Sequence, residues 1–361
     1  MWGCQVHETQ SGDFMATLPA TGTWSRGDQR LHSASVTLDR GLYNRAEWRE
    51  LLGRVRDRTI VWTWNTQPVF AGLLINPGRL NGRTNELQFQ YADPSELLDG
   101  RWLFGVGTSR GEGGYKPNGK TQLLGLSRRG VVIELARIGY TDASISPAWP
   151  IPARIPAREA GPVNETFYHY NFEAIDTLMQ DQVTMAGGPD IDLKPEFVGN
   201  KIRWEFRVGN PYLTGSPIDI NLMAPENAVT DWFYEENGEE KLTGMHGPGM
   251  GSDEDMVVGA AFEPVSAGLA KDGIHVDKND DNVDRRSNSV RGRLDGLKDV
   301  VKQWDVTVNA RDFNPAVHSL GSIVSLNLRD HAWLPDGWND TRVIGLSGND
   351  SDEIQLDLET V

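Results

Sequence analysis

The sequence predicts a mainly β, multidomain protein with α+β portions, and three observations lead to this fold class. Short segments alternate apolar and polar residues with a period of two, which places one set of side chains on a buried face and the other in water. Glycine, proline, asparagine and aspartate separate these segments, as they do at turns. The chain has 361 residues, 12 of them tryptophan, and 38% are hydrophobic. That length exceeds one small core, so we expect about two to four domains.

The first hundred residues predict a β-rich region with one helix. Weak alternation marks a strand over 31–39, and Asn44 is suited to cap a helix over about 45–56. The apolar residues of that helix recur at the spacing of one face: Trp48, Leu51, Leu52 and Val55. A hairpin of 59–64 and 69–75, a strand over 86–91 and a short helix after Asp93 follow. We place the first domain at residues 1–100.

Residues 101–162 predict a glycine- and proline-rich connection. Glycines crowd 105–119, which indicates a flexible loop. A dinucleotide-binding motif would need a third glycine one position before Gly111 and a long buried strand ahead of it, so we disfavour that reading. The apolar run 131–135 predicts a strand. The proline-rich stretch 146–162 predicts an extended linker and a domain boundary.

A central α+β domain is predicted over 163–286. A helix is expected from about 171 to 183, and Gly187-Gly188-Pro189 is expected to stop it. Strands are expected at 191–193, 201–208 and 218–222. The strand 230–235 has a suitable hairpin partner in 241–243 across Asn237-Gly238. Two stretches rich in glycine or aspartate, 246–255 and 277–286, are expected to be surface loops.

The last predicted domain, 287–361, combines a helix with a small antiparallel sheet. The helix is expected over 288–303, with its apolar face packed on the sheet. That face consists of Val290, Leu294, Leu297 and Val301. Strands are expected at 304–308, 323–328, 342–345 and 354–358, and Pro335-Asp336-Gly337 predicts a turn. The final strand is expected to be tied into the sheet.

Composition excludes several classes of protein. The net charge is -16, the reverse of what phosphate neutralisation by a general nucleic-acid binder requires. Two interpretations stay open: the acids serve solubility, or they form walls that repel DNA. No apolar run is long enough to span a membrane, and the first residues lack a secretory signal, so we expect synthesis and folding in a cytoplasm. The single cysteine, Cys4, excludes a disulfide framework.

No arrangement of residues predicts catalysis, a cofactor or a metal, and we expect the protein not to be an enzyme. The histidines form none of the paired zinc motifs, and no nucleophile elbow is present. Asp277, Asn279 and Asp281 have the spacing of a calcium loop. However, Asn282 and Asn288 occupy the positions that require glycine and glutamate, so a solvated turn is the simpler interpretation.

Two sets of residues are candidates for contacts. Trp62 and Trp64 share one strand face, and Trp333 and Trp338 flank the Pro-Asp-Gly turn. Each pair could pack in a core, form a subunit interface, or stack on sugars of a cell-wall polymer. The second set is the one local excess of positive charge, which we expect to contact a neighbouring protein: Arg110, Lys116, Lys120, Arg128 and Arg129.

The C-terminal strands and turns resemble those of phage minor tail proteins, in particular the central tail-tip hub proteins of long-tailed phages that infect actinobacteria. The matching residues are Gly321, Ser322, Val324, Leu326, Asp330, Leu334, Asp336, Gly337, Arg342, Val343, Gly345 and Ser347. The family more often has aspartate at the position of Ser322. A second match is the pair Trp62-Thr63-Trp64 and Phe70-Ala71-Gly72, followed by Asp93, Leu97, Leu98 and Arg101. The middle of the chain is covered only loosely.

The resemblance implies a structural protein of the virion tail tip with β-barrel-like domains. It implies a homotrimeric ring that joins the distal tail protein to the host-facing tip. The tape-measure protein would pass through the bore of this ring, and DNA would follow it, in transit only. Other minor tail proteins or tail fibres are the further expected partners, and stable membrane insertion is not expected. The alternative is an adhesin that binds a receptor or cell-wall carbohydrate. A cell-wall hydrolase is disfavoured because no catalytic constellation is present.

Overall fold

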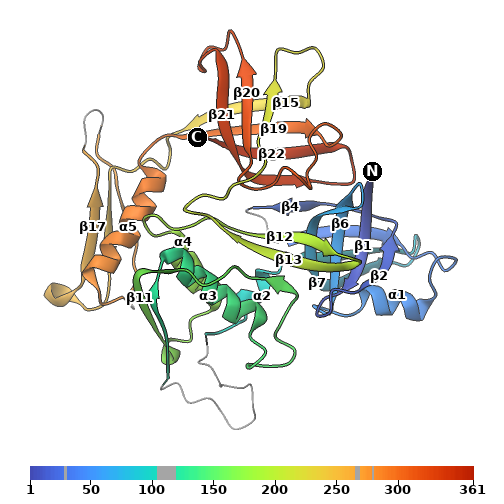
Figure 1. The fold of residues 1–361 in the computed structure, drawn as a ribbon, viewed down its shortest axis with the longest axis horizontal. Coiled ribbons are helices and arrows are strands. Elements are labelled where there is room, and N and C mark those ends of the chain that lie inside the picture. The colour runs from blue at the N-terminus through green and yellow to red at the C-terminus, as the bar shows by residue number, and fades with distance from the viewer. Residues whose placement is uncertain (28–30, 104–118, 265–268, 279) are drawn as a thin grey trace.

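The structure is a computed structural model that describes residues 1–27, 31–103, 119–264, 269–278 and 280–361. Most of the described elements are strands, which form two large and three small sheets. A few helices pack on these sheets (Figure 1). The predicted fold class, mainly β with α+β portions, is confirmed. The described helices include none that is long and apolar enough to cross a membrane.

The N-terminal sheet contains seven strands in the order β2-β1-β6-β7-β8-β5-β3. Its elements are β1 (Trp2–Glu8), β2 (Phe14–Leu18), β3 (Ala20–Gly22), β5 (Leu31–Thr37), β6 (Arg58–Trp64), β7 (Gln67–Asn81), β8 (Glu86–Ala92) and the helix α1 (Arg45–Leu52). The two end strands, β2 and β3, are consecutive in the chain and only Pro19 lies between them. The sheet therefore curls round until its last strand lies next to its first, which is barrel-like.

Most local predictions for this region are confirmed, but α1 ends at Leu52, so Val55, expected on its buried face, lies beyond the helix and is 43% exposed. Asn44 caps α1: its side chain accepts hydrogen bonds from the backbone N–H groups of Ala46 and Glu47, and Glu47 returns a bond to the Asn44 N–H. Trp48, Leu51 and Leu52 form the buried face of the helix. Every residue of β6 is buried, because both of its faces are covered: Trp62 and Trp64 lie in the apolar cluster of the two large sheets, and Val61 packs in the cluster of the central region.

The C-terminal sheet also has seven strands, in the order β14-β20-β21-β22-β19-β15, with β4 paired to β21. Its elements are β4 (Trp24–Arg26), β14 (Ile218–Asn221), β15 (Val229–Asn237), β19 (Val301–Asn309), β20 (Ile323–Leu328), β21 (Gly337–Gly348) and β22 (Glu353–Thr360). The predicted terminal strands are confirmed, and β22 is tied in by pairing with both β21 and β19. The predicted 241–243 hairpin partner for β15 is wrong, since β15 pairs with β19 instead.

One apolar cluster runs through both large sheets. Trp24 of β4, 1% exposed, lies in it together with residues of the N-terminal sheet and of β19, β21 and β22. The segment 14–26 thus closes the N-terminal sheet with β2 and β3 and then joins the C-terminal sheet with β4. The two sheets form a single packed body.

The central region has its own apolar cluster. Its elements are α2 (Glu96–Asp99), β9 (Lys120–Leu126), α3 (Arg128–Thr141), β10 (Ala153–Arg154), β11 (Ala160–Tyr168), the short 3-10 helix η1 (His169–Asn171), α4 (Ile175–Val183), β12 (Ile191–Val198) and β13 (Lys201–Val208). The predicted strands at 191–193 and 201–208 are confirmed. The predicted helix is present, but it begins at Ile175 and not near 171, because residues 169–171 form η1 and Phe172 has a left-handed backbone conformation.

Two predictions for the central region are wrong. Residues 131–135 lie in the helix α3 and do not form a strand, because an apolar run that is buried on every side carries no periodicity to separate the two. Ser127 caps that helix by accepting a hydrogen bond from the Gly130 N–H. The proline-rich stretch is also no free linker, since Trp149 and Ile151 are 5% and 6% exposed. The glycine-rich segment 105–119 lies outside the described residues, apart from Gly119.

Residues 238–300 form a lobe inserted between two paired strands. Asn237 ends β15, Val301 begins β19, and these two residues face each other in the sheet. The lobe contains β16 (Gly244–Pro248), the 3-10 turn η2 (Asp253–Asp255), β17 (Val258–Phe262), β18 (Asp272–Ile274) and α5 (Val283–Leu297). Its small core consists of Met245, Ala261, Val290 and Leu294, with Leu242 and Leu297 packed against it.

The lobe corrects three predictions. The helix begins at Val283, not at 288, and ends at Leu297, so Val301 lies in a strand and is 41% exposed. It packs on β16 and β17 and not on the terminal sheet. The predicted loop 246–255 includes the end of strand β16, which pairs with both β17 and β18. The four-part division of the chain stays a prediction, although the C-terminal sheet takes strands from before residue 287.

Candidate assembly surfaces

The first predicted tryptophan pair lies in the core. Trp62 and Trp64 are 1% and 3% exposed. The indole N–H of Trp62 donates to the hydroxyl of Tyr91 at 2.6 Å, and that hydroxyl donates to the carbonyl of Thr23. Burial raises the pKa of Tyr91, so the hydroxyl keeps the proton that this chain of bonds requires. Within this chain both rings are packing residues, the simplest of the interpretations offered above.

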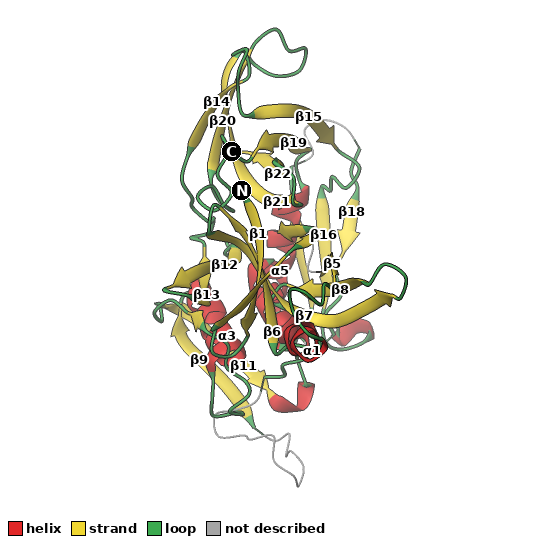
Figure 2. Ribbon diagram, turned by 90° about the vertical axis from the view of Figure 1, so that its right-hand side faces the viewer, coloured by secondary structure: helices red, strands yellow, loops and turns green. Residues whose placement is uncertain are grey.

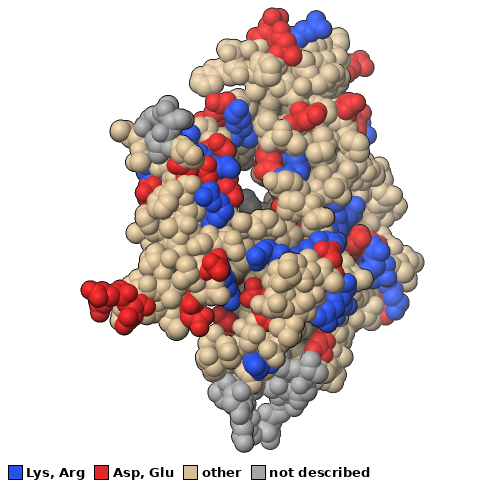
Figure 3. All heavy atoms as spheres, turned by 60° about the vertical axis from the view of Figure 1, so that its left-hand side comes forward, with Lys and Arg blue, Asp and Glu red and all other residues tan. Residues whose placement is uncertain are grey.

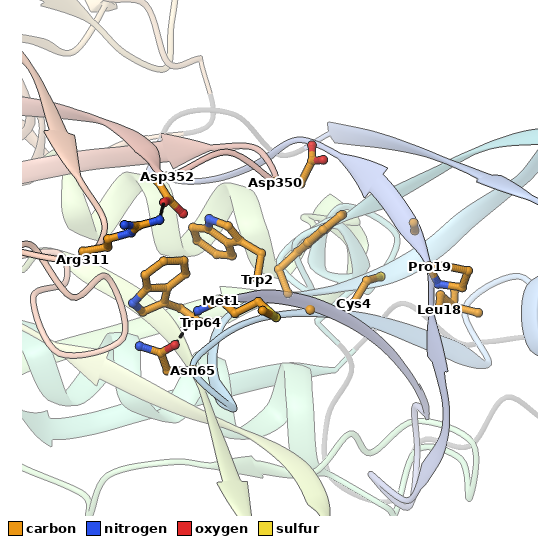
Figure 4. Close-up of a pocket in the computed structure, with 13 residues that line it drawn as sticks. Met1, Trp2, Cys4, Leu18, Pro19, Trp64, Asn65, Arg311, Asp350 and Asp352 are labelled. Carbon is orange, nitrogen blue, oxygen red and sulfur yellow. Dashed lines mark hydrogen bonds and ion pairs between the residues drawn. The ribbon is translucent and has the colours of Figure 1, made fainter.

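A pocket of about 650 Å³ lies where the N-terminal strand meets the C-terminal sheet (Figure 4). Trp2 contacts Trp64, with ring centroids 5.0 Å apart, and its indole N–H donates to the carbonyl of Ser351. Arg311 and Asp352 form an ion pair of 2.8 Å at one side. Cys4 also lines the pocket, but burial raises its pKa to about 12, so the thiol is not a nucleophile at neutral pH.

The second predicted tryptophan pair is exposed. Trp333 and Trp338 are 71% and 55% exposed on the connection between β20 and β21 and at the start of β21. His331, two residues before Trp333, packs on Trp232 of the far strand β15 with ring centroids 5.4 Å apart. This contact, together with one to Tyr234, packs the β20–β21 connection against the end strand β15. The two exposed indole rings therefore lie on or beside a connection that aromatic packing holds against the sheet.

The structure divides the predicted basic cluster. Arg110 and Lys116 lie outside the described residues. Lys120 is exposed at the start of β9. Arg129 pairs with Glu159 and also donates to the Val208 carbonyl. Arg128 donates to the side-chain oxygen of Gln182 at 2.9 Å, and burial lowers its pKa. Two of the described members therefore stabilise the central region itself.

A buried ion network that the sequence did not indicate joins three parts of the chain. Asp192 of β12 accepts from Arg26 of β4 and from Arg207 of β13, at 2.5 Å and 2.9 Å. Arg207 also donates to the Leu320 carbonyl, 3.1 Å away. Asp93 nearby is half-buried, and desolvation raises its pKa. No spacing along the sequence could have predicted partners separated by more than 150 residues.

Charge is distributed unevenly between the two large sheets. Residues 1–100 contain eleven acidic and ten basic side chains. Residues 218–240 and 301–361, which form most of the C-terminal sheet, contain seventeen acidic and four basic side chains. Acidic side chains accordingly outnumber basic ones over the upper part of Figure 3, which the C-terminal sheet forms. The net charge of the protein is therefore mainly a property of this one sheet.

The lobe meets the central region through charged groups and through the backbone, since the Ala186 N–H donates to the Asn288 carbonyl at 3.2 Å. Figure 3 shows a hollow beside the lobe with side chains of both charges at its rim. Arg285 of α5 pairs with Glu165 of β11 at 3.3 Å and lies 3.6 Å from Asp280. Asp181 and Glu173 face this junction, and burial is the main cause that raises the pKa of each. No apolar cluster of described residues spans the contact.

No metal site is assembled by the described residues: no three His, Cys, Asp or Glu side chains come together. Among the residues with the spacing of a calcium loop, Asn279 lies outside the described residues. The carboxylate of Asp277 lies 3.7 Å from the guanidinium of Arg286. His169, a further candidate ligand by type, contacts the Thr121 hydroxyl at 3.0 Å.

Three solved structures share this fold over almost their full length. The 43 kDa tail protein of prophage MuSo2 from Shewanella oneidensis has a TM-score of 0.59 and 8% identity, covering 99% of this chain and 98% of its own. A tail protein from Neisseria meningitidis has a TM-score of 0.53 and 10% identity, covering 99% and 96%. A prophage tail protein from Listeria monocytogenes has a TM-score of 0.51 and 8% identity, covering 99% and 94%.

The chain therefore has the fold of phage tail proteins. No protein-family profile matches the sequence, and no curated protein matches it. At 8–10% identity the similarity establishes the fold, and it does not identify the residues of any contact surface.

Proposed function

We propose that this protein is a structural hub of a phage tail tip. The observation that carries the proposal is the match over 99% of the chain to tail proteins of three prophages, with nearly their whole length covered. The two barrel-like sheets packed as one body agree with a structural role. The sequence resemblance to hub proteins of long-tailed phages points to actinobacteria as the host group.

In this proposal three copies form a ring around the tail axis. One side of the ring joins the distal tail protein, and the other joins the host-facing tip with its minor tail proteins or fibres. The tape-measure protein and then DNA pass through the bore, and the protein performs no catalytic turnover. We propose an acidic or neutral bore, because a wall of lysine and arginine would hold phosphates and slow the passage of DNA. The excess of acids in the C-terminal sheet supports such a wall.

The mass of the purified protein tests the ring. A hub should give an assembly of about three times 40.1 kDa in light scattering or native mass spectrometry. A monomer at all accessible concentrations, together with tight binding to host cell-wall glycan, would instead support an adhesin.

The adhesin is the second candidate because of one observation, the exposure of Trp333 and Trp338 at the β20–β21 connection of the C-terminal sheet. Exposed indole rings stack on sugars, but they also anchor protein interfaces. Replacing both by alanine separates the two: loss of glycan binding supports the adhesin, and loss of a tail-protein contact supports the hub. We also propose that the basic cluster, of which Lys120, Arg128 and Arg129 are described, faces a neighbouring protein and does not line the bore.

A further inference from the structure

The three-stranded sheet of the lobe is covered by a helix on one side. That side carries Met245 and Ala261, which form a small core with Val290 and Leu294 of α5. Figure 1 shows α5 between the strands of the lobe and the rest of the chain (Figure 2 gives the side view). Neighbouring residues along a strand point to opposite sides of a sheet. The residues that alternate with Met245 and Ala261 therefore point away from the helix.

Alternate residues of all three strands lie on this second side, because β16 pairs with β17 on one edge and with β18 on the other. The pairing continues beyond Ile274, since the Asp277 N–H donates to the Pro248 carbonyl at 2.9 Å. Val276 therefore belongs to the same side. We call this side the outer face, and it consists of His246, Pro248, Val258, Ala260, Phe262, Ile274 and Val276.

The outer face is mainly apolar and is open to solvent. Ile274 is 71% exposed, and three further apolar side chains are about half exposed: Val258, Phe262 and Val276. His246 packs edge-on against Phe262, with ring centroids 5.3 Å apart. Single exposed apolar residues are ordinary on a protein surface, whereas a contiguous group of them marks an interaction site.

Acidic residues lie at both ends of the outer face. Asp272, which pairs with Gly244 at one end, has its carboxylate 3.8 Å from the His246 ring. The turn η2 (Asp253–Asp255), with three acids in a row, lies in the β16–β17 connection at the other end. No described lysine or arginine forms an ion pair with the acids of η2.

The basic residues of the lobe do not cancel this charge. Residues 238–282, which include the whole sheet, contain ten acidic and three basic side chains. Three of these acids lie against arginines of α5, at 3.7 Å or less: Glu263, Asp277 and Asp280. The three lysines balance three more acids, so an excess of four acids remains on the sheet side of the lobe.

We propose that the outer face binds an amphipathic helix of another protein, with its apolar side chains on the sheet and its lysines or arginines over the acidic ends. A helix is the fitting element because α5 already covers the opposite side, and a second helix completes a three-layer lobe. The acidic ends select basic flanks. The inference stands on the lobe alone and does not depend on the proposed function.

Other occupants fit this surface less well. A second copy of the chain offers no such helix among its described residues, because α1, α3, α4 and α5 each bury their apolar side chains within the chain. Nucleic acids and anionic membranes carry the wrong charge for the acidic ends. The partner is therefore a different protein.

Two synthetic helices test the proposal with the full chain in fluorescence anisotropy. One is an amphipathic helix of leucine and lysine, and the other has glutamate in place of every lysine. The leucine–lysine helix should bind at least about tenfold more tightly. Phe262→Asp with Ile274→Asp should weaken its binding at least about tenfold, because the apolar anchors are lost. The two added acids alone would strengthen binding, so this loss separates docking on the outer face from simple charge attraction.

A second variant tests the acidic ends. Asp253→Asn with Glu254→Gln should weaken binding of the leucine–lysine helix several-fold and reduce its dependence on salt. Phe233→Asp is the matched control, since Phe233 is an exposed aromatic residue on the more acidic C-terminal sheet, and it should bind like the wild type. Circular dichroism should report an unchanged fold for every variant. Ile274→Asp alone, at the most exposed of these positions, keeps the test valid if the double variant loses the lobe.

Four results would overturn the proposal. They are the absence of measurable binding to the wild type, equal binding of the two helices, unchanged binding in both Ile274→Asp variants, and an equal loss in Phe233→Asp. Binding of anionic lipid vesicles that Ile274→Asp abolishes would also overturn it, because the occupant would then be a membrane. None of these results bears on the trimeric ring, which is tested separately by mass.

Discussion

The two seven-stranded sheets are alike inside and different outside. Both contribute alternating side chains to one shared apolar cluster. The end strands of the N-terminal sheet are linked through Pro19, whereas in the C-terminal sheet His331 of the β20–β21 connection packs on the end strand β15. Their surfaces differ: residues 1–100 are almost balanced in charge, whereas the C-terminal sheet segments carry seventeen acids and four bases. The inward residues thus specify a common architecture, and the outward residues specify what each sheet meets.

A third region shows what the shared core provides. Among its described residues, the lobe 238–300 buries four apolar side chains in its own cluster, and it meets the central region through ion pairs and a backbone hydrogen bond. The two sheets should therefore unfold as one unit, and the lobe should open by itself. The predictions below test this difference, from the largest expected effect to the smallest.

Replacing Trp24 should break the union of the two sheets. Trp24 is 1% exposed and lies in the cluster that both sheets share. Trp24→Ala should lower the free energy of unfolding by about 3–5 kcal/mol, because a large cavity opens between them. Chemical denaturation followed by tryptophan fluorescence measures the change. The exposed Trp338→Ala is the control, and an equal loss for both variants would contradict a shared core.

Removing the carboxylate between Arg26 and Arg207 should have the next largest effect. Asp192→Ala leaves two guanidinium groups without their buried partner, and such losses cost about 3 kcal/mol. Asp352→Ala removes a carboxylate from the more exposed pair with Arg311 and should cost less than about 1 kcal/mol. Urea denaturation of the two variants side by side checks the difference.

The sequence predicted much of both sheets because their strands alternate. The residues Ile354, Leu356 and Leu358 show the period of two, and each is completely buried. The failures came where periodicity was absent or where partners are distant. The run 131–135 is apolar on all sides of a buried helix, and β15 found its partner in β19 beyond an inserted lobe. Local propensity gives no indication of either.

The candidate surfaces were less predictable than the fold. Trp62 and Trp333 are equally aromatic in sequence, yet one is 1% and the other 71% exposed. The central position of β6, with every residue buried, decides the first case.

A truncation in the lobe should stay local. Leu294 is completely buried against β16 and β17, so Leu294→Ala should cost about 2 kcal/mol or more in the stability of the lobe. Leu297 is only partly buried, so Leu297→Ala should lower the stability of the lobe by less than Leu294→Ala does. Hydrogen exchange should show faster exchange across 244–297 and unchanged protection in β6 and β22. Equal acceleration in those strands would mean that the lobe is not a separate unit.

The smallest effect concerns pH at the junction of the lobe. The pKa values of Asp181 and Glu173 are raised mainly by burial, so the folded state holds their protons more tightly than the unfolded state does. Their contribution to stability is present at low pH and is lost as pH rises through the raised pKa values. Asp181→Asn should therefore flatten this part of the pH–stability curve and stabilise the lobe at neutral pH.

Denaturation curves between about pH 4 and 8 measure this effect. The exposed Glu254→Gln should follow the wild-type curve and serves as the control. A steeper dependence in Asp181→Asn than in the wild type would show that the sign is wrong.

A cryo-electron microscopy map of a virion tail tip in which this chain is located tests the hub most directly. The account predicts three copies arranged as a ring around the tail axis. The surface of their bore should be acidic or neutral. Copies found only at the periphery, as parts of fibres away from the axis, would contradict it, as would a bore lined by Lys120, Arg128 and Arg129.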